Sequence, residues 1–277
     1  MKKTMTIIIS VILFLAVACV SFNYWLISPF NTKEDVLSSP DYFISHAGGS
    51  VDGHTYLNCK EGLLQSLENG YKYIEVDLAL TSDGAVVCLH DWKHFKTLVA
   101  IDIDNEPMSL QEFQQQKLLG KYTPLTLNDV ISIQKEHPFV IVTDKICNPS
   151  ILNQYFKENR DKVMVEAFSF DEYKQLKECG YTPMISISNF CKAHLKLLYN
   201  QQLSLKTKFE WVCVDSISNI NCLRALKRLF NCKIAMYTIN SESFFKEHLG
   251  KEIDLIYTDN WNLKTRSNND SINKGTY

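Results

Sequence analysis

Two carboxylates with the spacing of a β-strand are the first residues in this 277-residue chain that could do chemistry. Glu75 and Asp77 lie two positions apart in the apolar run 73–80, and residues two apart on a strand project from the same face. On a buried face such a pair would be destabilising unless a cation neutralised it, and oxygen ligands suit Mg²⁺ or Ca²⁺ rather than zinc. The pair therefore predicts a divalent-cation site, with an exposed strand of alternating polar and apolar residues as the alternative.

Three further polar residues stand at the ends of short apolar runs. His46 and His90 each close such a run, and Asp144 follows another. An imidazole can exchange protons near neutral pH, although a single histidine is more often structural, and a single aspartate often caps a helix or lies in a loop. Taken with the carboxylate pair, these residues predict a carboxylate-bound divalent cation flanked by two histidines, an arrangement that suits displacement at phosphorus.

The elements that must position these residues alternate between strands and helices from residue 42 to residue 263. Amphipathic helical patterns cover 60–69, 127–136, 150–159 and 171–179, and Ser169 with Glu172 has the spacing of a capping box. Nine short apolar runs are typical of strands: 42–46, 73–80, 85–90, 139–143, 163–168, 183–187, 211–214, 233–239 and 253–257. This alternation predicts an α/β fold, a (β/α)8 TIM-type barrel whose strand ends carry the polar residues.

Nine strand runs are one too many for eight barrel positions. The link Thr81-Ser82-Asp83-Gly84 is too short for a crossover, so the two runs that it joins are expected to pair antiparallel. Which run leaves the barrel stays open. A doubly wound open sheet is the alternative, but no GxGxxG motif follows any of the runs, so nothing indicates a dinucleotide site.

The N-terminus has the pattern of a membrane anchor. Residues 5–27 carry no charge and are long enough to span a bilayer, and Tyr24 and Trp25 suit its interface. Lys2 and Lys3 precede the span, which predicts a single-pass membrane protein with its main domain on the extracytoplasmic side. A cleaved signal peptide is the alternative. The expected organisation is an anchor at 1–28, a linker at 29–41, the barrel at 42–263 and a disordered tail at 264–277.

Overall charge argues against nucleic-acid binding, and cysteine spacing argues against a zinc site. The formal net charge is -2, and no basic face dominates, which argues against a nucleic-acid partner. None of the nine cysteines forms a CxxC pair or a Cys/His cluster with the spacing of zinc ligands.

An ordered set of motifs resembles the glycerophosphodiester phosphodiesterase family. The matching segments are His46-Ala47-Gly48, Asn58, Glu75-Val76-Asp77, Leu80-Thr81-Ser82-Asp83-Gly84, His90-Asp91, Tyr237-Thr238-Ile239-Asn240 and Tyr257-Thr258-Asp259. The resemblance implies a barrel enzyme that uses a divalent metal, commonly Mg²⁺ or Ca²⁺. It implies that Glu75 and Asp77 are metal ligands and that His46 and His90 are the acid/base pair. In this family a neighbouring substrate hydroxyl can attack phosphorus, and water then opens the cyclic phosphate.

The chain departs from the family pattern at several positions. Ala47 stands where the family usually has Arg, which removes a bidentate phosphate donor, and Lys145 or Lys93 is a candidate to compensate. Where the family has Glu-x-Lys, this chain has Asp144-Lys145, so Asp144 is assigned as the third metal ligand. On a regular strand Lys145 would point to the opposite side, unless a bulge restores it.

Three residues are expected to contact substrate: Lys145, Trp92 and Asn58. Trp92 directly follows His90-Asp91 and could wall the substrate site or pack in the core. Asn58 lies in Leu57-Asn58-Cys59, where the family has Glu-Asn-Thr.

The function that the resemblance implies is metal-dependent hydrolysis of glycerophosphodiesters or related phosphodiesters, and the predicted anchor would place it at the membrane surface. The substrate would be a small-molecule or lipid-derived phosphodiester. A phosphatidylinositol-specific phospholipase, which shares the barrel and the paired histidines, is one alternative, although the Glu75/Asp77 pair counts against its metal-independent form. A membrane-tethered binding module that has lost catalysis is another, motivated by Ala47 and the displaced Lys145.

Overall fold

The structure is a computed structural model that describes residues 2–31, 36–99 and 106–264. Residues 32–35 of the expected linker and residues 265–277 of the expected tail lie outside the described residues.

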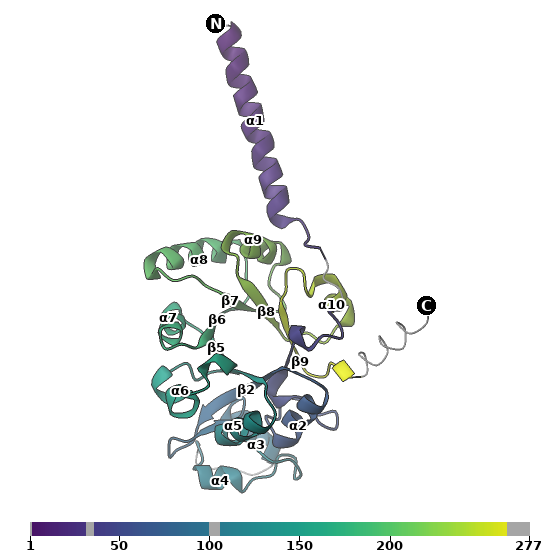
Figure 1. Ribbon diagram of the computed structural model, residues 1–277, viewed down its shortest axis with the longest axis vertical. Helices are drawn as coiled ribbons and strands as arrows, with labels where there is room; N and C mark the ends of the chain where they lie inside the picture. Colours follow the sequence, from purple (N-terminus) through teal and green to yellow (C-terminus); the bar gives the residue numbers. More distant parts are fainter. Residues whose placement is uncertain (1, 32–35, 100–105, 265–277) are drawn as a thin grey trace, which may run out of the picture.

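Eight parallel strands close into a barrel, as the alternation of elements predicts (Figure 1). Each strand pairs in parallel with its neighbours, and β1 pairs with both β2 and β9, which closes the ring. The barrel strands are β1 (Phe43–Ser45), β2 (Tyr73–Leu80), β4 (Val140–Asp144), β5 (Val163–Ala167), β6 (Thr182–Ile187), β7 (Trp211–Asp215), β8 (Lys233–Tyr237) and β9 (Leu255–Thr258). The fold is therefore a TIM-type barrel.

Helices cover the outside of the barrel, and several begin at side-chain caps that the sequence encodes. Ser169 and Glu172 form the predicted capping box, and Thr126 forms a second one with Asp129. The covering helices are α2 (Lys60–Glu68), α5 (Leu127–Glu136), α6 (Pro149–Phe156), α7 (Phe170–Glu178), α8 (Lys192–Leu205), α9 (Ile220–Phe230) and α10 (Glu242–His248).

Strand alternation divides the core into two layers. Side chains on the outward faces of the strands, such as Ile74 and Val76, pack under the helices. A smaller cluster on the inward faces, including Ile44, Val142 and Met184, fills the centre of the barrel. Glu75 and Asp77 alternate with the outward pair on β2, so their carboxylates face inward and are almost fully buried.

The surplus strand is β3 (Val86–Cys88), which pairs antiparallel with the far end of β2 and takes no place in the barrel. The β2–β3 hairpin turns through Thr81–Gly84, as the short link predicts. Beyond it, α3 (Trp92–Val99) and α4 (Leu110–Gln114) pack over a separate hydrophobic cluster that includes Phe95 and Phe113. The chain then returns to the barrel through α5.

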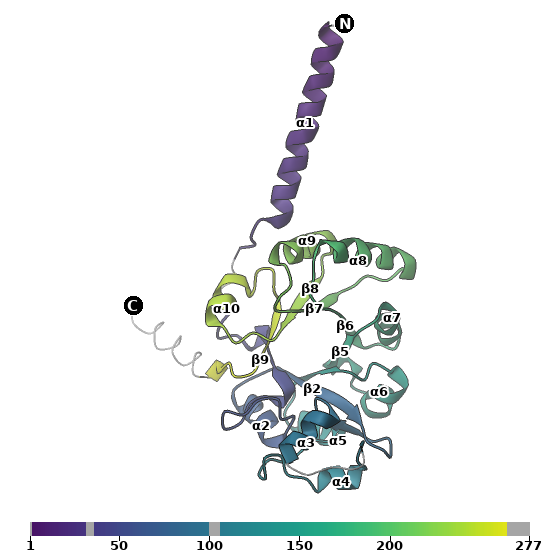
Figure 2. The ribbon, with the colours of Figure 1, turned by 180° about the vertical axis from the view of Figure 1, so that it is seen from behind.

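An apolar helix stands apart from the barrel. Helix α1 (Lys2–Ile27) contains the segment Met5–Ile27, which is long and apolar enough to cross a membrane, and no residue of its most apolar stretch is buried by the rest of the protein. Its carboxyl-terminal end meets the barrel at α9 (Figure 2). It is thus a candidate membrane span, by length and composition.

Candidate active site

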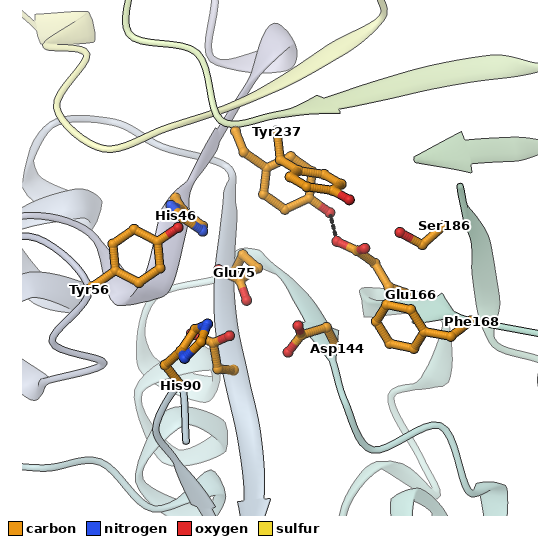
Figure 3. Close-up of a pocket in the computed structure, with 11 residues that line it drawn as sticks. His46, Tyr56, Glu75, His90, Asp144, Glu166, Phe168, Ser186 and Tyr237 are labelled. Carbon is orange, nitrogen blue, oxygen red and sulfur yellow. Dashed lines mark hydrogen bonds between the residues drawn. The ribbon is translucent and has the colours of Figure 1, made fainter. Parts of the chain in front are cut away.

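A cavity of about 180 Å³ opens where the barrel strands end at their carboxyl termini (Figure 3). The two histidines and the three carboxylates that the sequence predicts for the site all line this cavity. Its lining residues are His46, Tyr56, Glu75, Asp77, His90, Asp144, Glu166, Phe168, Ser186, Tyr237 and Tyr257.

Glu75, Asp77 and Asp144 form one compact carboxylate cluster. Each offers a carboxylate oxygen, and the three atoms lie within 4.8 Å of one another. The cluster forms because β2 and β4 pair in register, which places Asp77 opposite Asp144. Burial, reinforced by the charges of Asp77 and Asp144, raises the pKa of Glu75 well above its usual range. Burial and the charge of Asp77 raise the pKa of Asp144 to about 8.

A divalent cation fits this cluster. Asp144 Oδ1 is buried and has no hydrogen-bond partner, although buried polar atoms are normally paired. Three carboxylates with few neutralising contacts repel one another, and a cation bound to their oxygens would remove that repulsion. Oxygen-only donors are the ligand type that Mg²⁺ and Ca²⁺ prefer.

Backbone turns in the left-handed region hold two of the carboxylates from behind. The backbone N–H of Ala47 (φ +49°) donates to Glu75 Oε2 over 2.6 Å. The side chain of Asn58 (φ +47°) donates to Asp77 Oδ2 over 2.8 Å and accepts from the Asp77 backbone N–H over 3.1 Å. Asn58, expected to contact substrate, therefore lies behind Asp77 and does not line the cavity.

Lys145 reaches the site, although a regular strand would direct it away. Strand β4 ends at Asp144, and Lys145 adopts a left-handed conformation with φ +60°, so its side chain turns back toward the cavity. Its ammonium donates to Asp77 Oδ1 over 2.7 Å and also to the backbone oxygen of His90. A left-handed residue at the strand end, and not a bulge, brings it there.

Trp92 and Lys93 do not line the cavity. Trp92 begins α3, where its ring packs edge-on against Phe95 and Phe113 and its indole N–H donates to the Leu80 oxygen over 3.2 Å. Lys93 is exposed on the same helix. Of the two lysines proposed to replace the missing arginine, only Lys145 contacts residues of the site.

His46 is held by a carboxylate at the other end of the chain. Its Nδ1 lies 2.8 Å from Asp259 Oδ1, and Asn240 donates to Asp259 Oδ2 over 2.6 Å. Burial alone would raise the pKa of Asp259, but the hydrogen bonds from His46 and Asn240 outweigh it and hold the pKa below its usual value. Because Asp259 is ionised and can only accept, the His46 proton sits on Nδ1, which leaves Nε2 available for proton exchange.

His90 has the same kind of support from its neighbour. Its Nδ1 lies 2.6 Å from Asp91 Oδ2, while Asp91 Oδ1 accepts from the backbone N–H of His94 over 2.7 Å. Asp91 thus both orients His90 and caps α3, and these contacts hold its pKa below the usual value, with the His94 hydrogen bond as the largest cause. Both histidines therefore carry a carboxylate on Nδ1 and face one cavity (Figure 3).

The sequence alone does not assign a role to Tyr56, Asp259 or Glu166. Asp259 lies in a motif that matches the closing strand of the family, but no local pattern pairs it with His46, which is 213 residues away. The ring of Tyr56 (φ +61°) lies 4.5 Å from that of His46 and 5.8 Å from that of His90, measured between centroids. Glu166 is buried and accepts from the Tyr257 hydroxyl over 2.5 Å.

Replacing Asp259 with Asn is expected to lower turnover about 10²- to 10⁴-fold with little change in KM, because an imidazole held in the wrong tautomer loses its contribution as a general acid or base. The amide removes the negative charge that fixes the His46 tautomer and stabilises its protonated form. Steady-state kinetics on a phosphodiester would measure the effect. Unchanged turnover would show that His46 needs no such support.

Replacing Glu166 with Gln is expected to flatten the dependence of stability on pH. Burial raises the pKa of Glu166 above its usual 4.5, so between that value and the raised pKa the folded chain binds more protons than the unfolded chain. Stability therefore falls as pH rises through this window. Gln keeps the acceptor for Tyr257 but cannot ionise. Calorimetry between about pH 5 and pH 8 with chelator present should give a smaller fall in Tm for the variant, and equal slopes would contradict the assignment.

Comparisons with known proteins identify the same family that the motifs resemble. The sequence profile of the glycerophosphoryl diester phosphodiesterase family matches residues 57–219. Glycerophosphodiester phosphodiesterase GDPD6 from Arabidopsis thaliana is 24% identical over 182 residues, which cover 54% of this chain and 47% of the plant protein. The chain thus spans about half the length of that relative.

Solved structures share the fold. A phosphodiesterase from Oleispira antarctica, in complex with the product sn-glycerol-3-phosphate, has a TM-score of 0.65 and 19% identity, with 83% of this chain and 96% of that chain covered. The glycerophosphodiester phosphodiesterase from Thermotoga maritima has a TM-score of 0.62 and 21% identity, with 81% and 97% covered. With its profile match over more than half of the sequence, the chain belongs to the glycerophosphoryl diester phosphodiesterase family, a family of phosphoric diester hydrolases.

Proposed function

We propose that this protein hydrolyses glycerophosphodiesters or related phosphodiesters at a membrane surface, with Mg²⁺ or Ca²⁺ as cofactor. The observation that carries the proposal is a single cavity in which the Glu75, Asp77 and Asp144 cluster lies with two carboxylate-supported histidines. A cation would stabilise three closely spaced carboxylates, of which Glu75 and Asp77 are buried, and two imidazoles with available Nε2 atoms can move protons to and from a phosphodiester.

The residues divide the reaction between them. A divalent cation held by Glu75, Asp77 and Asp144 would supply positive charge to the phosphoryl oxygens and to the transition state. One imidazole takes the proton from a substrate hydroxyl next to the phosphate as that hydroxyl attacks phosphorus, and the other gives a proton to the leaving alcohol oxygen. Water then opens the cyclic phosphate with the two roles exchanged.

Supporting groups fix the geometry of this transfer. Asp259 and Asp91 hold the Nδ1 atoms, so that each imidazole presents Nε2. Lys145 provides a positive charge beside Asp77, which lines the cavity, in a chain where Ala47 replaces the family's arginine. A lysine ammonium acts there as a point charge rather than as a bidentate donor, so we expect weaker orientation of the phosphate than an arginine gives.

The size of the cavity suits a small polar head group. A volume of about 180 Å³ accommodates a glycerol phosphate more readily than a whole phospholipid. The related enzyme from Oleispira antarctica holds sn-glycerol-3-phosphate as its product, which supports a glycerol-phosphate product here. We propose that the leaving alcohol lies against Phe168 and Tyr237 at the edge of the cavity.

The proposed location follows from α1. Its apolar segment would span the membrane once, and Lys2 and Lys3 before it favour a cytoplasmic N-terminus, with the barrel on the opposite side.

The test is product analysis on the full chain in detergent. Glycerophosphocholine, glycerophosphoinositol and phosphatidylinositol would be incubated with Mg²⁺, with Ca²⁺ or with chelator. We expect sn-glycerol-3-phosphate as the product, formed only with a divalent cation. Release of inositol phosphate from phosphatidylinositol would instead indicate the phospholipase, and binding without turnover on every substrate would indicate a binding module.

A further inference from the structure

Exposed apolar side chains gather on one side of the barrel. Among the described residues outside α1, eight large apolar side chains are exposed, and five of them lie on α8, on α9 or in the loop before α9. Their exposed fractions are 41% for Leu197, 57% for Tyr199, 61% for Leu203, 71% for Ile217 and 51% for Leu229. Single exposed apolar residues need no explanation, but a concentration on two adjacent helices indicates a contact surface.

The same side of the barrel receives the end of α1. Arg228 donates to the Leu26 oxygen over 2.8 Å, and its guanidinium lies 4.1 Å from the ring centre of Phe30 and 5.5 Å from that of Trp25. Arg224 donates to the Ile27 oxygen over 3.3 Å. These contacts fix the last turn of α1 against α9, and therefore fix the level at which a bilayer around α1 would end relative to the barrel.

In both views α9 lies directly at the end of α1, and α8 lies beside α9 (Figures 1 and 2). On α8, Leu198 is fully buried and packs toward the barrel. Four exposed residues recur at helical spacing on the other face: Lys192, Lys196, Tyr199 and Leu203. On this face two lysines are followed by an aromatic and a leucine, a set that suits contact with a membrane interface, because long lysine side chains reach lipid phosphates while apolar side chains enter the acyl boundary.

We infer that the outer face of α8 and α9, defined by Lys192, Lys196, Tyr199, Leu203 and Leu229, rests on the bilayer that α1 spans. The inference depends on the proposed membrane anchoring and adds a second contact to it. Tyr199 and Leu203 enter the boundary between head groups and acyl chains, and the two lysines pair with lipid phosphates. The barrel is then held at two points and keeps one orientation to the membrane.

The test uses the full chain in nanodiscs that contain a phosphatidylcholine with a photoactivatable diazirine near its glycerol backbone. After illumination, labelled peptides are mapped by mass spectrometry. We expect the peptides of α1 to be labelled, and those of α8 to carry at least about fivefold more label than those of α4, which lies on the distant hairpin side. Adding phosphatidylglycerol should increase the labelling of α8, and Lys192→Gln with Lys196→Gln should cancel that increase.

Matched variants separate the surface from the anchor. Leu203→Ser should lower the labelling of α8 severalfold and leave that of α1 unchanged, whereas Leu119→Ser, which alters an exposed leucine outside this face, should change neither. Labelled α1 with α8 no more labelled than α4 would overturn the inference and leave the anchor standing. Unlabelled α1 would overturn both the anchor and the inference.

Discussion

The double variant Glu75→Gln/Asp144→Asn will lower phosphodiester turnover by about 10³-fold or more, because it removes two of the three charges available to a cation. The side chains keep their size, and the Gln amide oxygen can still accept from the Ala47 N–H. Asp77, with its contacts to Asn58 and Lys145, is untouched. Loss of activity should therefore reflect loss of the cation rather than of the fold, and turnover assays at saturating Mg²⁺ or Ca²⁺ would measure it.

Stability measurements on the same variant give an independent readout. In chelator we expect the variant to unfold at the same or a higher temperature than the natural chain, because two carboxyl groups whose pKa values burial raises are replaced by amides that cannot ionise. Added Mg²⁺ or Ca²⁺ should raise the Tm of the natural chain and leave that of the variant unchanged. Glu166→Gln is the matched control, since it neutralises a carboxylate of the same cavity outside the cluster and should keep the cation-induced rise. An equal rise in the double variant would refute the cation site.

Alanine at His46 or at His90 is expected to lower turnover about 10²- to 10⁴-fold in each case, the usual contribution of a general acid or base. A substrate with a nitrophenol leaving group separates their roles. Nitrophenolate leaves without help from an acid, so the deficit of one variant should shrink on this substrate while that of the other persists.

His137→Ala provides the control for the histidine variants. His137 is exposed at the end of α5, away from the cavity, and its replacement should leave both substrates unaffected. Variants of His46 and His90 that retain full activity on every substrate would contradict the two-histidine mechanism. If each variant loses the same factor of turnover on the nitrophenol substrate as on the ordinary substrate, neither imidazole protonates the leaving group.

The barrel could be predicted from the sequence because its strands and helices have clear periods. Alternate burial on β2 already separates Glu75 and Asp77 from their apolar neighbours, and the register with β4 then brings Asp144 beside them. The identity of the surplus strand was not accessible, because β3 has the same apolar composition as a barrel strand. β3 is left out of the barrel because it pairs antiparallel with β2, and that pairing is decided by tertiary packing rather than by local sequence.

Features of the site that depend on the conformation of a single residue, or on contacts between residues far apart in the sequence, could not be predicted from the sequence either. The prediction that Lys145 points away assumed a regular strand, but one left-handed residue reverses its direction. The contact between His46 and Asp259 joins the first and last strands, and only closure of the barrel creates it. The position of Trp92 directly after Asp91 suggested that its ring could line the substrate site. The ring packs instead against a neighbouring apolar cluster, because helix α3 begins at this residue.

The β2–β3 hairpin joins His90 to the carboxylate cluster. His90 follows β3, and the backbone N–H of Leu89 donates to the Asp77 oxygen over 3.0 Å, while Asp77 and the other proposed cation ligands lie on strands of the barrel wall. Lys145 contacts both Asp77 and the backbone oxygen of His90, so a shift of this hairpin would reach the carboxylate cluster as well. The gap between the two imidazoles therefore cannot be widened for a bulkier alcohol by changing the hairpin alone, and a library aimed at new substrates would have to vary the hairpin together with the contacts of Lys145.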